Sequence, residues 1–245
     1  SAARDRQQRV EHHRISAVTV EVEDHPEEVR LVVSDTGCGI PAENMKRLFK
    51  AGEQIDATMK KIGAFAAEEG VPVLPRGAGT SQCGQTVGEA IVGDTTKHLN
   101  SIIGLDAETR AVTVEPGVVL DALNAYLRPH GLFFPVDPST ASRATLGGMA
   151  ANNSCGARSI RYGLMRHNVR AIDATLADGA EARFAELPDD PAALSAAPRY
   201  AELVRAMQAL GAREAAEIAA RFPALLRRVG GYNIDALAPG GDGTG

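Results

Sequence analysis

The sequence predicts an α+β chain in which a β-hairpin and a short helix precede a larger domain of short strands and helices. Residues 15–35 alternate apolar and polar residues on both sides of a polar break at His25 and Pro26, which is typical of a hairpin. Beyond residue 56, short apolar runs alternate with stretches in which apolar residues recur at helical spacing. Both patterns within one chain favour the α+β class.

The helices are predicted from capping residues and from the spacing of apolar residues. Pro41 and Glu43 suit the first turn of the short helix after the hairpin. Two further helices end at the capping glycines Gly70 and Gly131. Their apolar faces consist of Met59, Ile62, Phe65 and Ala66 in the first helix and of Leu120, Leu123 and Leu127 in the second.

Strands are predicted where short apolar or alternating runs are bounded by turn residues. They cover 71–74, 91–94, 111–115 and 169–177, and the last one ends at the turn Asp178-Gly179. Residues 191–228 are rich in Ala, Leu, Arg and Glu and predict two or three helices, with breaks near Gly211 and Pro223.

Composition limits the classes of function. The 245 residues carry a formal net charge of -5, which gives no electrostatic footprint for nucleic acid. Cys38, Cys83 and Cys155 are odd in number, lie far apart and indicate a reducing compartment rather than a metal site. No apolar run approaches the roughly 18 residues that a membrane span needs, so we expect a soluble cytoplasmic protein.

Directly after the first strand of the larger domain, residues 75–86 read PRGAGTSQCGQT. Glycine lets a ligand approach the backbone, and successive N–H groups in such a loop form a concave anion site. Thr80 and Ser81 add hydroxyl donors and Arg76 adds charge, so a phosphate cradle is one interpretation. A tight turn that merely needs glycine is the other. The spacing fits neither the dinucleotide fingerprint nor the Walker motif.

A second glycine-rich stretch, DPSTASRATLGGMAANNSCGARSIRYG, covers residues 137–163. It combines small residues with the side-chain amides of Asn152 and Asn153 and has almost no acidic charge. Such a segment suits a flat ligand with polar edges that lies against the backbone, whereas the alternative is a long surface loop.

Together, the two stretches resemble the flavin-binding domain of the vanillyl-alcohol oxidase superfamily, and most closely its FAD-linked D-2-hydroxy acid dehydrogenases. The resemblance covers roughly residues 57–235 and matches both loops in order, type and separation. It implies a fold with two subdomains, namely a small parallel βαβ unit and a larger, mainly antiparallel sheet with helices. It also implies bound FAD and the oxidation of a D-2-hydroxy acid by hydride transfer, with electrons passed on to an acceptor.

The resemblance assigns cofactor-binding roles to residues in both loops and in a turn between them. These residues are Arg76, Gly77, Ala78, Gly79, Thr80, Ser81, Gly84, Gln85, Pro116, Gly117, Pro138, Ser139, Thr140, Thr145, Gly147, Gly148, Asn152, Asn153, Ser154, Gly156, Arg161, Tyr162 and Gly163. Residues 76–85 contain no histidine, so we expect non-covalent FAD. If φ of Ala78 must be positive, its methyl group costs on the order of 1 kcal/mol.

In this superfamily, the catalytic base, the substrate carboxylate site and often a metal site lie in a C-terminal cap. The chain ends before such a cap, so we expect a cofactor-binding fragment without full turnover, and we assign neither catalytic nor metal-binding residues. The superfamily also has a strand before the helix at 57–69, where this chain has KAGEQ. The parallel sheet therefore lacks one strand or takes it from the hairpin.

Residues 15–50 resemble part of a histidine-kinase-type ATPase domain. Asp35, Gly37 and Gly39 match its Asp-x-Gly-x-Gly motif, in which the aspartate accepts a hydrogen bond from adenine. We divide the chain into a kinase-like fragment at 1–54, an FAD-binding domain at 55–238 and a tail at 239–245. The alternative functions are an ATP-binding fragment and a non-catalytic remnant of a flavoprotein.

Overall fold

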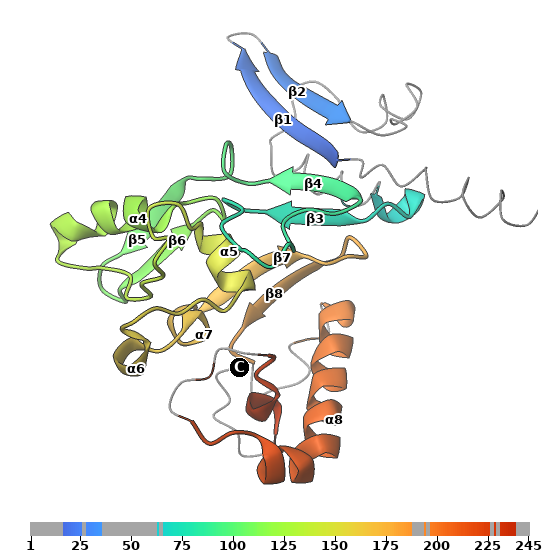
Figure 1. Ribbon diagram of the computed structural model, residues 1–245, viewed down its shortest axis with the longest axis vertical. Helices are drawn as coiled ribbons and strands as arrows, with labels where there is room; N and C mark the ends of the chain where they lie inside the picture. The colour runs from blue at the N-terminus through green and yellow to red at the C-terminus, as the bar shows by residue number, and fades with distance from the viewer. Residues whose placement is uncertain are drawn as a thin grey trace, which may run out of the picture. The chain divides into compact units, whose positions relative to one another are not determined.

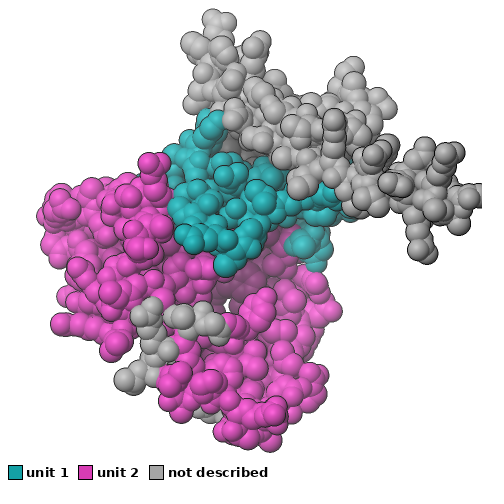
Figure 2. Space-filling view, viewed as in Figure 1, with its two compact units in different colours: residues 1–106, 111–118, 177–179 teal, residues 107–110, 119–176, 180–245 magenta. Residues whose placement is uncertain are grey.

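The computed structural model describes residues 17–25, 28–35, 63, 66–187, 194, 197–225, 228 and 231–238. The chain divides into two compact units (Figure 2). Unit 1 comprises residues 1–106, 111–118 and 177–179, and unit 2 comprises 107–110, 119–176 and 180–245. The predicted helix at Pro41, most of the predicted helix at 57–69 and the tail at 239–245 lie outside the described residues.

Unit 1 contains a four-stranded sheet of order β2-β1-β4-β3. Its strands are β1 (Ala17–His25), β2 (Glu28–Asp35), β3 (Val73–Arg76) and β4 (Ala90–Asp94) (Figure 1). β1 and β2 pair antiparallel, which confirms the predicted hairpin, and β4 pairs in parallel with both β3 and β1. Of the two alternatives for the parallel sheet, the structure therefore shows the one in which the hairpin supplies a strand.

A glycine cap fixes the chain direction between the first described helical turn and β3. The Val71 N–H donates to the Ala66 carbonyl at 2.8 Å, and the Gly70 N–H donates to the Ala67 carbonyl at 3.4 Å. These two bonds form a Schellman motif, in which the capping residue needs positive φ. Gly70 has φ of +67°, so the predicted C-cap is confirmed.

The remaining strands form two antiparallel hairpins. β5 (Ile102–Asp106) pairs with β6 (Ala111–Val114), and β7 (Ala171–Thr175) pairs with β8 (Glu181–Ala185). The predictions at 111–115 and 169–177 correspond to β6 and β7, whereas β5 and β8 were not predicted. Within the described residues, these strands make two separate sheets, and the mixture of helices and sheets confirms the α+β class.

Unit 2 consists of several short helices, one long helix and a hairpin. Its elements are α4 (Leu120–Leu127), η1 (Arg128–His130), α5 (Leu146–Ala151), α6 (Ser159–Tyr162), α7 (Met165–Asn168), β7, β8, α8 (Pro198–Arg221) and η3 (Ile234–Leu237). Leu120, Leu123 and Leu127 of α4 are buried, as the helical pattern predicts, and Gly131 ends this segment with φ of +69°. No helix in the described part of the chain is both long and apolar enough to cross a bilayer.

The C-terminal helices differ from the prediction. α8 runs without a break from Pro198 to Arg221, so the expected break near Gly211 is wrong, whereas the helix does end just before Pro223. Gly211 serves packing instead. A Cβ atom at this position would lie 1.9 Å from the Leu237 carbonyl oxygen, so only glycine allows η3 to lie this close to α8.

Replacing Gly211 by alanine is expected to destabilise the protein, although alanine favours the helix by about 1 kcal/mol. The clash is with a backbone carbonyl, which cannot rotate away, so η3 must move off α8. Thermal unfolding should show a lower Tm, and limited proteolysis should cut faster near Leu237. An increase in Tm would contradict the packing role of Gly211. Gly88→Ala, at a glycine with nothing within 4 Å, is the control.

Candidate cofactor site

The first glycine loop, residues 76–85, leaves the sheet at the carboxyl end of β3. Because β3 and β4 run parallel, their carboxyl ends share one edge, and ligands of open α/β sheets bind at this edge. Gly79 and Gly84 have φ of +66° and +83°, so both positions require glycine. Ala78 is not among the described residues with positive φ. Its methyl group therefore does not cause the backbone strain that a positive φ would have produced.

The Arg76 side chain folds back against the loop. A Cβ atom on Gly79 would lie 2.9 Å from Nη2 and 3.0 Å from Nε of Arg76. Nε is buried and has no hydrogen-bond partner among the described residues. The guanidinium therefore places a positive charge beside the loop backbone. Farther along the loop, the Gln85 side-chain amide donates to the Ser81 hydroxyl.

The segment from Thr95 to Leu99, to which the sequence analysis assigns no role, contacts both the first glycine loop and the Pro116-Gly117 turn. The Thr95 backbone N–H and hydroxyl donate to the Arg76 carbonyl at 3.0 and 3.3 Å. The Gly117 N–H donates to the Leu99 carbonyl at 2.6 Å, and a Cβ atom on Gly117 would lie 2.1 Å from the Thr95 carbonyl oxygen. Thr95 thus contacts the start of the loop and the turn.

The sequence does contain a local signal for this segment. Asp94 Oδ1 accepts hydrogen bonds from the backbone N–H and the hydroxyl of Thr96 at 2.8 and 2.6 Å. This is the turn that an aspartate followed by hydroxyl residues favours. The motif DTT at the end of a strand predicts such a turn, although it does not predict what the turn touches.

The second glycine segment, residues 137–163, folds within unit 2 as turns and the two short helices α5 and α6. The first turn starts at Pro138, whose carbonyl accepts a hydrogen bond from the Ala141 N–H at 3.1 Å. The Thr140 carbonyl accepts one from the Ala144 N–H at 2.7 Å. Thr145 then forms an isolated antiparallel bridge with Val119 and precedes α5. Thr145 is 2% exposed, and its hydroxyl has no hydrogen-bond partner among the described residues.

The two predicted asparagines mainly fold the segment itself. Asn153 has φ of +44°, and its Oδ1 accepts from the Arg166 N–H at 3.0 Å, which fixes the start of α7. The Asn152 amide donates to the Ser154 hydroxyl at 3.2 Å, and the Ser154 carbonyl accepts from the Met165 N–H at 3.0 Å. A ligand role of either amide stays a prediction.

Gly156 lies directly against Asp137. A Cβ atom on Gly156 would lie 1.9 Å from the Asp137 carbonyl oxygen and 2.2 Å from its Oδ1. The same carboxylate accepts from the Arg158 N–H at 3.1 Å and lies 3.6 Å from Arg158 Nε. These contacts join the two ends of the segment.

The end of the segment is aromatic. Tyr162 is half-buried and lies edge-on to Phe133, with 5.8 Å between the ring centroids. The Arg161 guanidinium lies 5.3 Å from the Tyr162 ring, and Gly163 takes φ of +78° after it. Tyr162 therefore packs against Phe133, and its ligand role stays a prediction.

Comparison with known proteins decides the family. The family described as FAD binding domain matches residues 55–185, more than half of the chain. The chain belongs to this FAD-binding domain family. FAD is therefore the cofactor of the site, and the predicted fold of the superfamily is confirmed. A second family, the histidine kinase-, DNA gyrase B-, and HSP90-like ATPases, matches residues 7–71 and confirms the second predicted resemblance.

The similar proteins are much longer than the chain. It is 40% identical over 171 residues to a D-2-hydroxyglutarate dehydrogenase of Pseudomonas putida, which covers 68% of the chain and 17% of that protein. It is 39% identical over 125 residues to the glycolate oxidase subunit GlcD of Bacillus subtilis, covering 49% of the chain and 26% of the relative. A solved structure of 6-hydroxy-D-nicotine oxidase from Arthrobacter nicotinovorans gives a TM-score of 0.47 at 21% identity, covering 53% of the chain and 28% of that protein.

The residues of the FAD-binding domain fit the chemistry of FAD. Its pyrophosphate is an anion, and the first loop offers a backbone with positive-φ glycines and the buried Nε of Arg76, which has no hydrogen-bond partner among the described residues. The buried Thr145 hydroxyl in the second segment likewise has no partner within the described part of the chain. Buried polar groups normally have partners, so both point to a group that binds there.

The predicted residues fall into two sets. Unit 1 brings together Arg76–Gln85 with Pro116 and Gly117, and unit 2 brings together the residues from Pro138 to Gly163. Asp35 is the last residue of β2, whereas Gly37 and Gly39 lie outside the described residues. In the part of the chain that the structure describes, no three His, Cys, Asp or Glu side chains are grouped to hold a metal ion.

Replacing Thr95 by valine is expected to weaken FAD binding several-fold and to lower the free energy of unfolding by about 1 kcal/mol. Valine keeps the shape of the side chain but removes the hydroxyl that donates to the Arg76 carbonyl. Flavin titration and chemical denaturation measure the two effects. Thr95→Ser keeps the hydroxyl and is the matched control. If valine and serine bind FAD equally well, Thr95 does not position the loop through this bond.

Proposed function

We propose that the chain is the FAD-binding portion of a flavin-dependent oxidoreductase that oxidises a D-2-hydroxy acid of the lactate, glycolate or 2-hydroxyglutarate type. The observation that carries this proposal is the 40% identity over 171 residues to a D-2-hydroxyglutarate dehydrogenase. The geometry of the first glycine loop supports it, because the loop combines positive-φ glycines with the Arg76 charge at the carboxyl edge of parallel strands.

The chain's own residues bind and orient the cofactor in this proposal. Backbone N–H groups of residues 76–81, with Gly84 and Gln85, hold the pyrophosphate, and the Arg76 guanidinium stabilises its charge. Pro116 and Gly117 support the loop from the neighbouring turn. Residues 138–140 and the second segment up to Gly163 would bind the remaining part of the cofactor. Bound FAD supplies the acceptor for a hydride from the substrate's α-carbon.

The proposal includes non-covalent FAD, because residues 76–85 contain no histidine to which the flavin could be joined. It includes a 2-hydroxy acid substrate and an electron acceptor as partners. It also includes the division of the chain into a kinase-like fragment at 1–54, an FAD-binding domain at 55–238 and a tail at 239–245. The proposal includes a reducing compartment, because the three cysteines are odd in number and lie far apart in the sequence. We assign no catalytic residue.

The first experiment is to purify the chain, record its visible spectrum, denature it and identify the released flavin by chromatography. We expect a yellow protein that releases FAD on denaturation. D-lactate, glycolate and D-2-hydroxyglutarate are then added without oxygen, and bleaching of the flavin band reports hydride transfer. A colourless protein that takes up no added FAD would contradict the proposal and support a non-catalytic remnant. FAD binding without bleaching is the result expected of a cofactor-binding portion, whereas bleaching by one of the three acids would identify the substrate and show that this chain can accept the hydride.

The match of residues 7–71 to the kinase-type ATPases favours a second candidate, an ATP-binding fragment. Asp35 stands at the end of β2, where the motif places its adenine-binding aspartate. Magnesium-dependent ATP binding that is lost in Asp35→Asn would support this candidate, and FAD binding should be unchanged in the same variant. No ATP binding at millimolar nucleotide would exclude it.

A further inference from the structure

The chain from the end of α4 to just beyond η1 exposes aromatic and basic side chains. Tyr126, Arg128 and His130 are all exposed, and 5.9 Å separates the centroids of the Tyr126 and His130 rings. Phe133 follows in the sequence and is 50% exposed. Rings and positive charge are therefore grouped along one short segment.

Hydrogen bonds hold this segment against α4. The Leu132 N–H donates to the Leu127 carbonyl at 3.3 Å, and the Phe134 N–H donates to Asn124 Oδ1 at 2.8 Å. Both acceptors lie on α4, so the chain after η1 turns back along this helix. Phe133, between the two donors, is thus fixed beside α4 with half of its surface exposed.

Helix α6 extends the group through Phe133. Phe133 lies edge-on to Tyr162, and the Arg161 guanidinium lies 5.3 Å from the same Tyr162 ring. The preceding residue on α6, Ile160, is 72% exposed. We call the exposed side chains of this group the α4–α6 surface, which consists of Tyr126, Arg128, His130, Phe133, Ile160 and Arg161.

The α4–α6 surface lies in the basic part of an acidic chain. Residues 122–172 contain six arginines, no lysine and one acidic residue, Asp137, which gives a formal charge of +5, whereas the whole chain carries -5. Asp137 lies 3.6 Å from Arg158. Arg128 and Arg161 are exposed, and neither forms an ion pair within the described part of the chain. Both guanidinium groups are therefore accessible to a carboxylate.

Taken singly, these features have ordinary explanations. Arg128 and His130 follow the C-terminal end of α4, where basic side chains stabilise the helix dipole, and single exposed apolar residues are common. Together they have the composition of a protein-interface hot spot, in which aromatic rings lie beside arginine. Charge complementarity then favours an acidic partner. A nucleic acid would need a longer row of phosphate contacts than these two arginines supply.

We propose that the α4–α6 surface binds an acidic protein segment, whose carboxylates pair with Arg128 and Arg161 and whose aromatic or aliphatic side chain packs on Phe133. This interaction goes beyond the proposed function and does not depend on hydride transfer. Arg161 is the one member of the surface that also has a predicted role toward FAD. Binding is therefore measured both with and without FAD.

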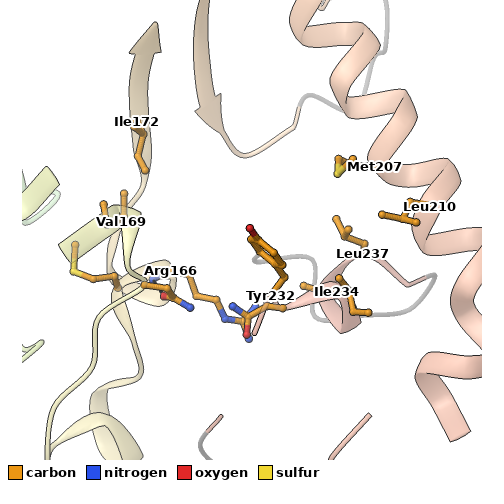
Figure 3. A pocket seen from close by; sticks show the side chains of 13 residues that line it. Arg166, Val169, Ile172, Met207, Leu210, Tyr232, Ile234 and Leu237 are labelled. Atoms are coloured by element: carbon orange, nitrogen blue, oxygen red, sulfur yellow. Dashed lines mark hydrogen bonds between the residues drawn. The ribbon is translucent and has the colours of Figure 1, made fainter. Parts of the chain in front are cut away.

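The α4–α6 surface is distinct from the apolar cavity of unit 2, which Figure 3 shows. This cavity has a volume of about 520 Å³, and its described lining, which includes Ile172, Met207 and Leu237, contains no residue of the surface. Met207 is 42% exposed. It therefore provides an exposed apolar side chain at another place in the same unit.

Synthetic copolymers measure the interaction. Fluorescein-labelled poly(Glu,Tyr) supplies carboxylates with aromatic rings, poly-Glu supplies carboxylates alone, and poly(Lys,Tyr) supplies rings with the opposite charge. By fluorescence anisotropy at low salt, we expect saturable binding of poly(Glu,Tyr), with the same affinity with and without FAD. Poly-Glu and a single-stranded oligonucleotide should bind at least about tenfold more weakly, and poly(Lys,Tyr) should not bind.

Variants test the location of the interaction. Arg128→Gln and Arg161→Gln should each weaken binding of poly(Glu,Tyr) at least about threefold, and Phe133→Ser about tenfold. Arg205→Gln removes an exposed arginine of α8, and Met207→Ser removes the exposed apolar side chain at the cavity. Both lie outside the α4–α6 surface and should leave binding unchanged. The Tm of each variant shows whether it is folded.

Four results would overturn the proposal. Absence of poly(Glu,Tyr) binding at low salt would show that the surface takes no acidic segment, and equal binding of the oligonucleotide would make it a general polyanion site. Equal losses in Arg128→Gln and Arg205→Gln would place the interaction elsewhere. Loss of binding in the presence of FAD would assign Arg161 to the cofactor. A dimer of the chain alone that Phe133→Ser dissociates, seen by size-exclusion chromatography, would make a second copy the partner.

Discussion

Replacing Gly156 by alanine is expected to abolish the fold of the second glycine segment and, with it, FAD binding. The added Cβ would lie 1.9 Å from the Asp137 carbonyl oxygen and 2.3 Å from its carbonyl carbon. Both are backbone atoms, so neither can rotate away, and the two ends of the segment must separate. This separation also breaks the bond from the Arg158 N–H to the Asp137 carboxylate.

We expect the free energy of unfolding to fall by about 3 kcal/mol, a large value that is typical of overpacking at a close backbone contact. Chemical denaturation measures this change, and the flavin content of the purified protein measures the cofactor. Gly88→Ala is the control, because a Cβ atom at that glycine meets nothing within 4 Å. Gly156→Ala with wild-type stability and full flavin content would contradict the close contact.

Features with a local chemical cause were predictable from the sequence. Gly70 and Gly131 were recognised as caps because positive φ at a helix end is a property of the cap itself. The first glycine loop was recognised for the same reason, since its backbone conformation requires glycine whatever lies around it. The hairpin of β1 and β2 was visible because an alternating pattern on both sides of a polar break predicts strand pairing.

Features set by contacts between distant residues were not predictable. The sequence predicts a helix break at Gly211, but α8 continues through it. Gly211 is needed instead because Leu237 packs directly against it. Leu237 is 26 positions away in the sequence, so this contact leaves no local signal. Thr95 shows no ligand motif, and its importance comes from the carbonyl of Arg76 and from Gly117. β5 contains Gly104, which weakens a strand signal, and its pairing with β6 stabilises it.

The position of β1 illustrates the same distinction. The sequence showed that the parallel sheet has KAGEQ where the superfamily has a strand, and that a hairpin precedes it. It could not decide whether this hairpin joins the sheet, because parallel pairing leaves no turn signal between the strands. The register of Val18 against Ile91 is a contact across more than 70 residues.

Replacing Gly79 by valine is expected to remove FAD binding, with a dissociation constant raised at least about 100-fold. Two effects combine at this position. The φ of +66° is strongly disfavoured for a β-branched residue, and the new Cβ would lie 2.9 Å from Arg76 Nη2. Valine therefore either turns the loop backbone or displaces the guanidinium, and both changes remove the anion site. Flavin content after purification and titration with added FAD measure the loss.

Gly70→Val separates these two effects. Gly70 has nearly the same φ, +67°, but a Cβ atom there meets nothing within 4 Å, and the residue caps a helix outside the cofactor site. Both variants should lose stability because of the strained φ, by roughly 1–2 kcal/mol. Gly79→Val alone should lose FAD. If both variants lose FAD equally, general strain in unit 1 explains the effect, and if neither does, residues 76–81 do not bind the pyrophosphate. The pair thus tests the phosphate site itself rather than the need for glycine.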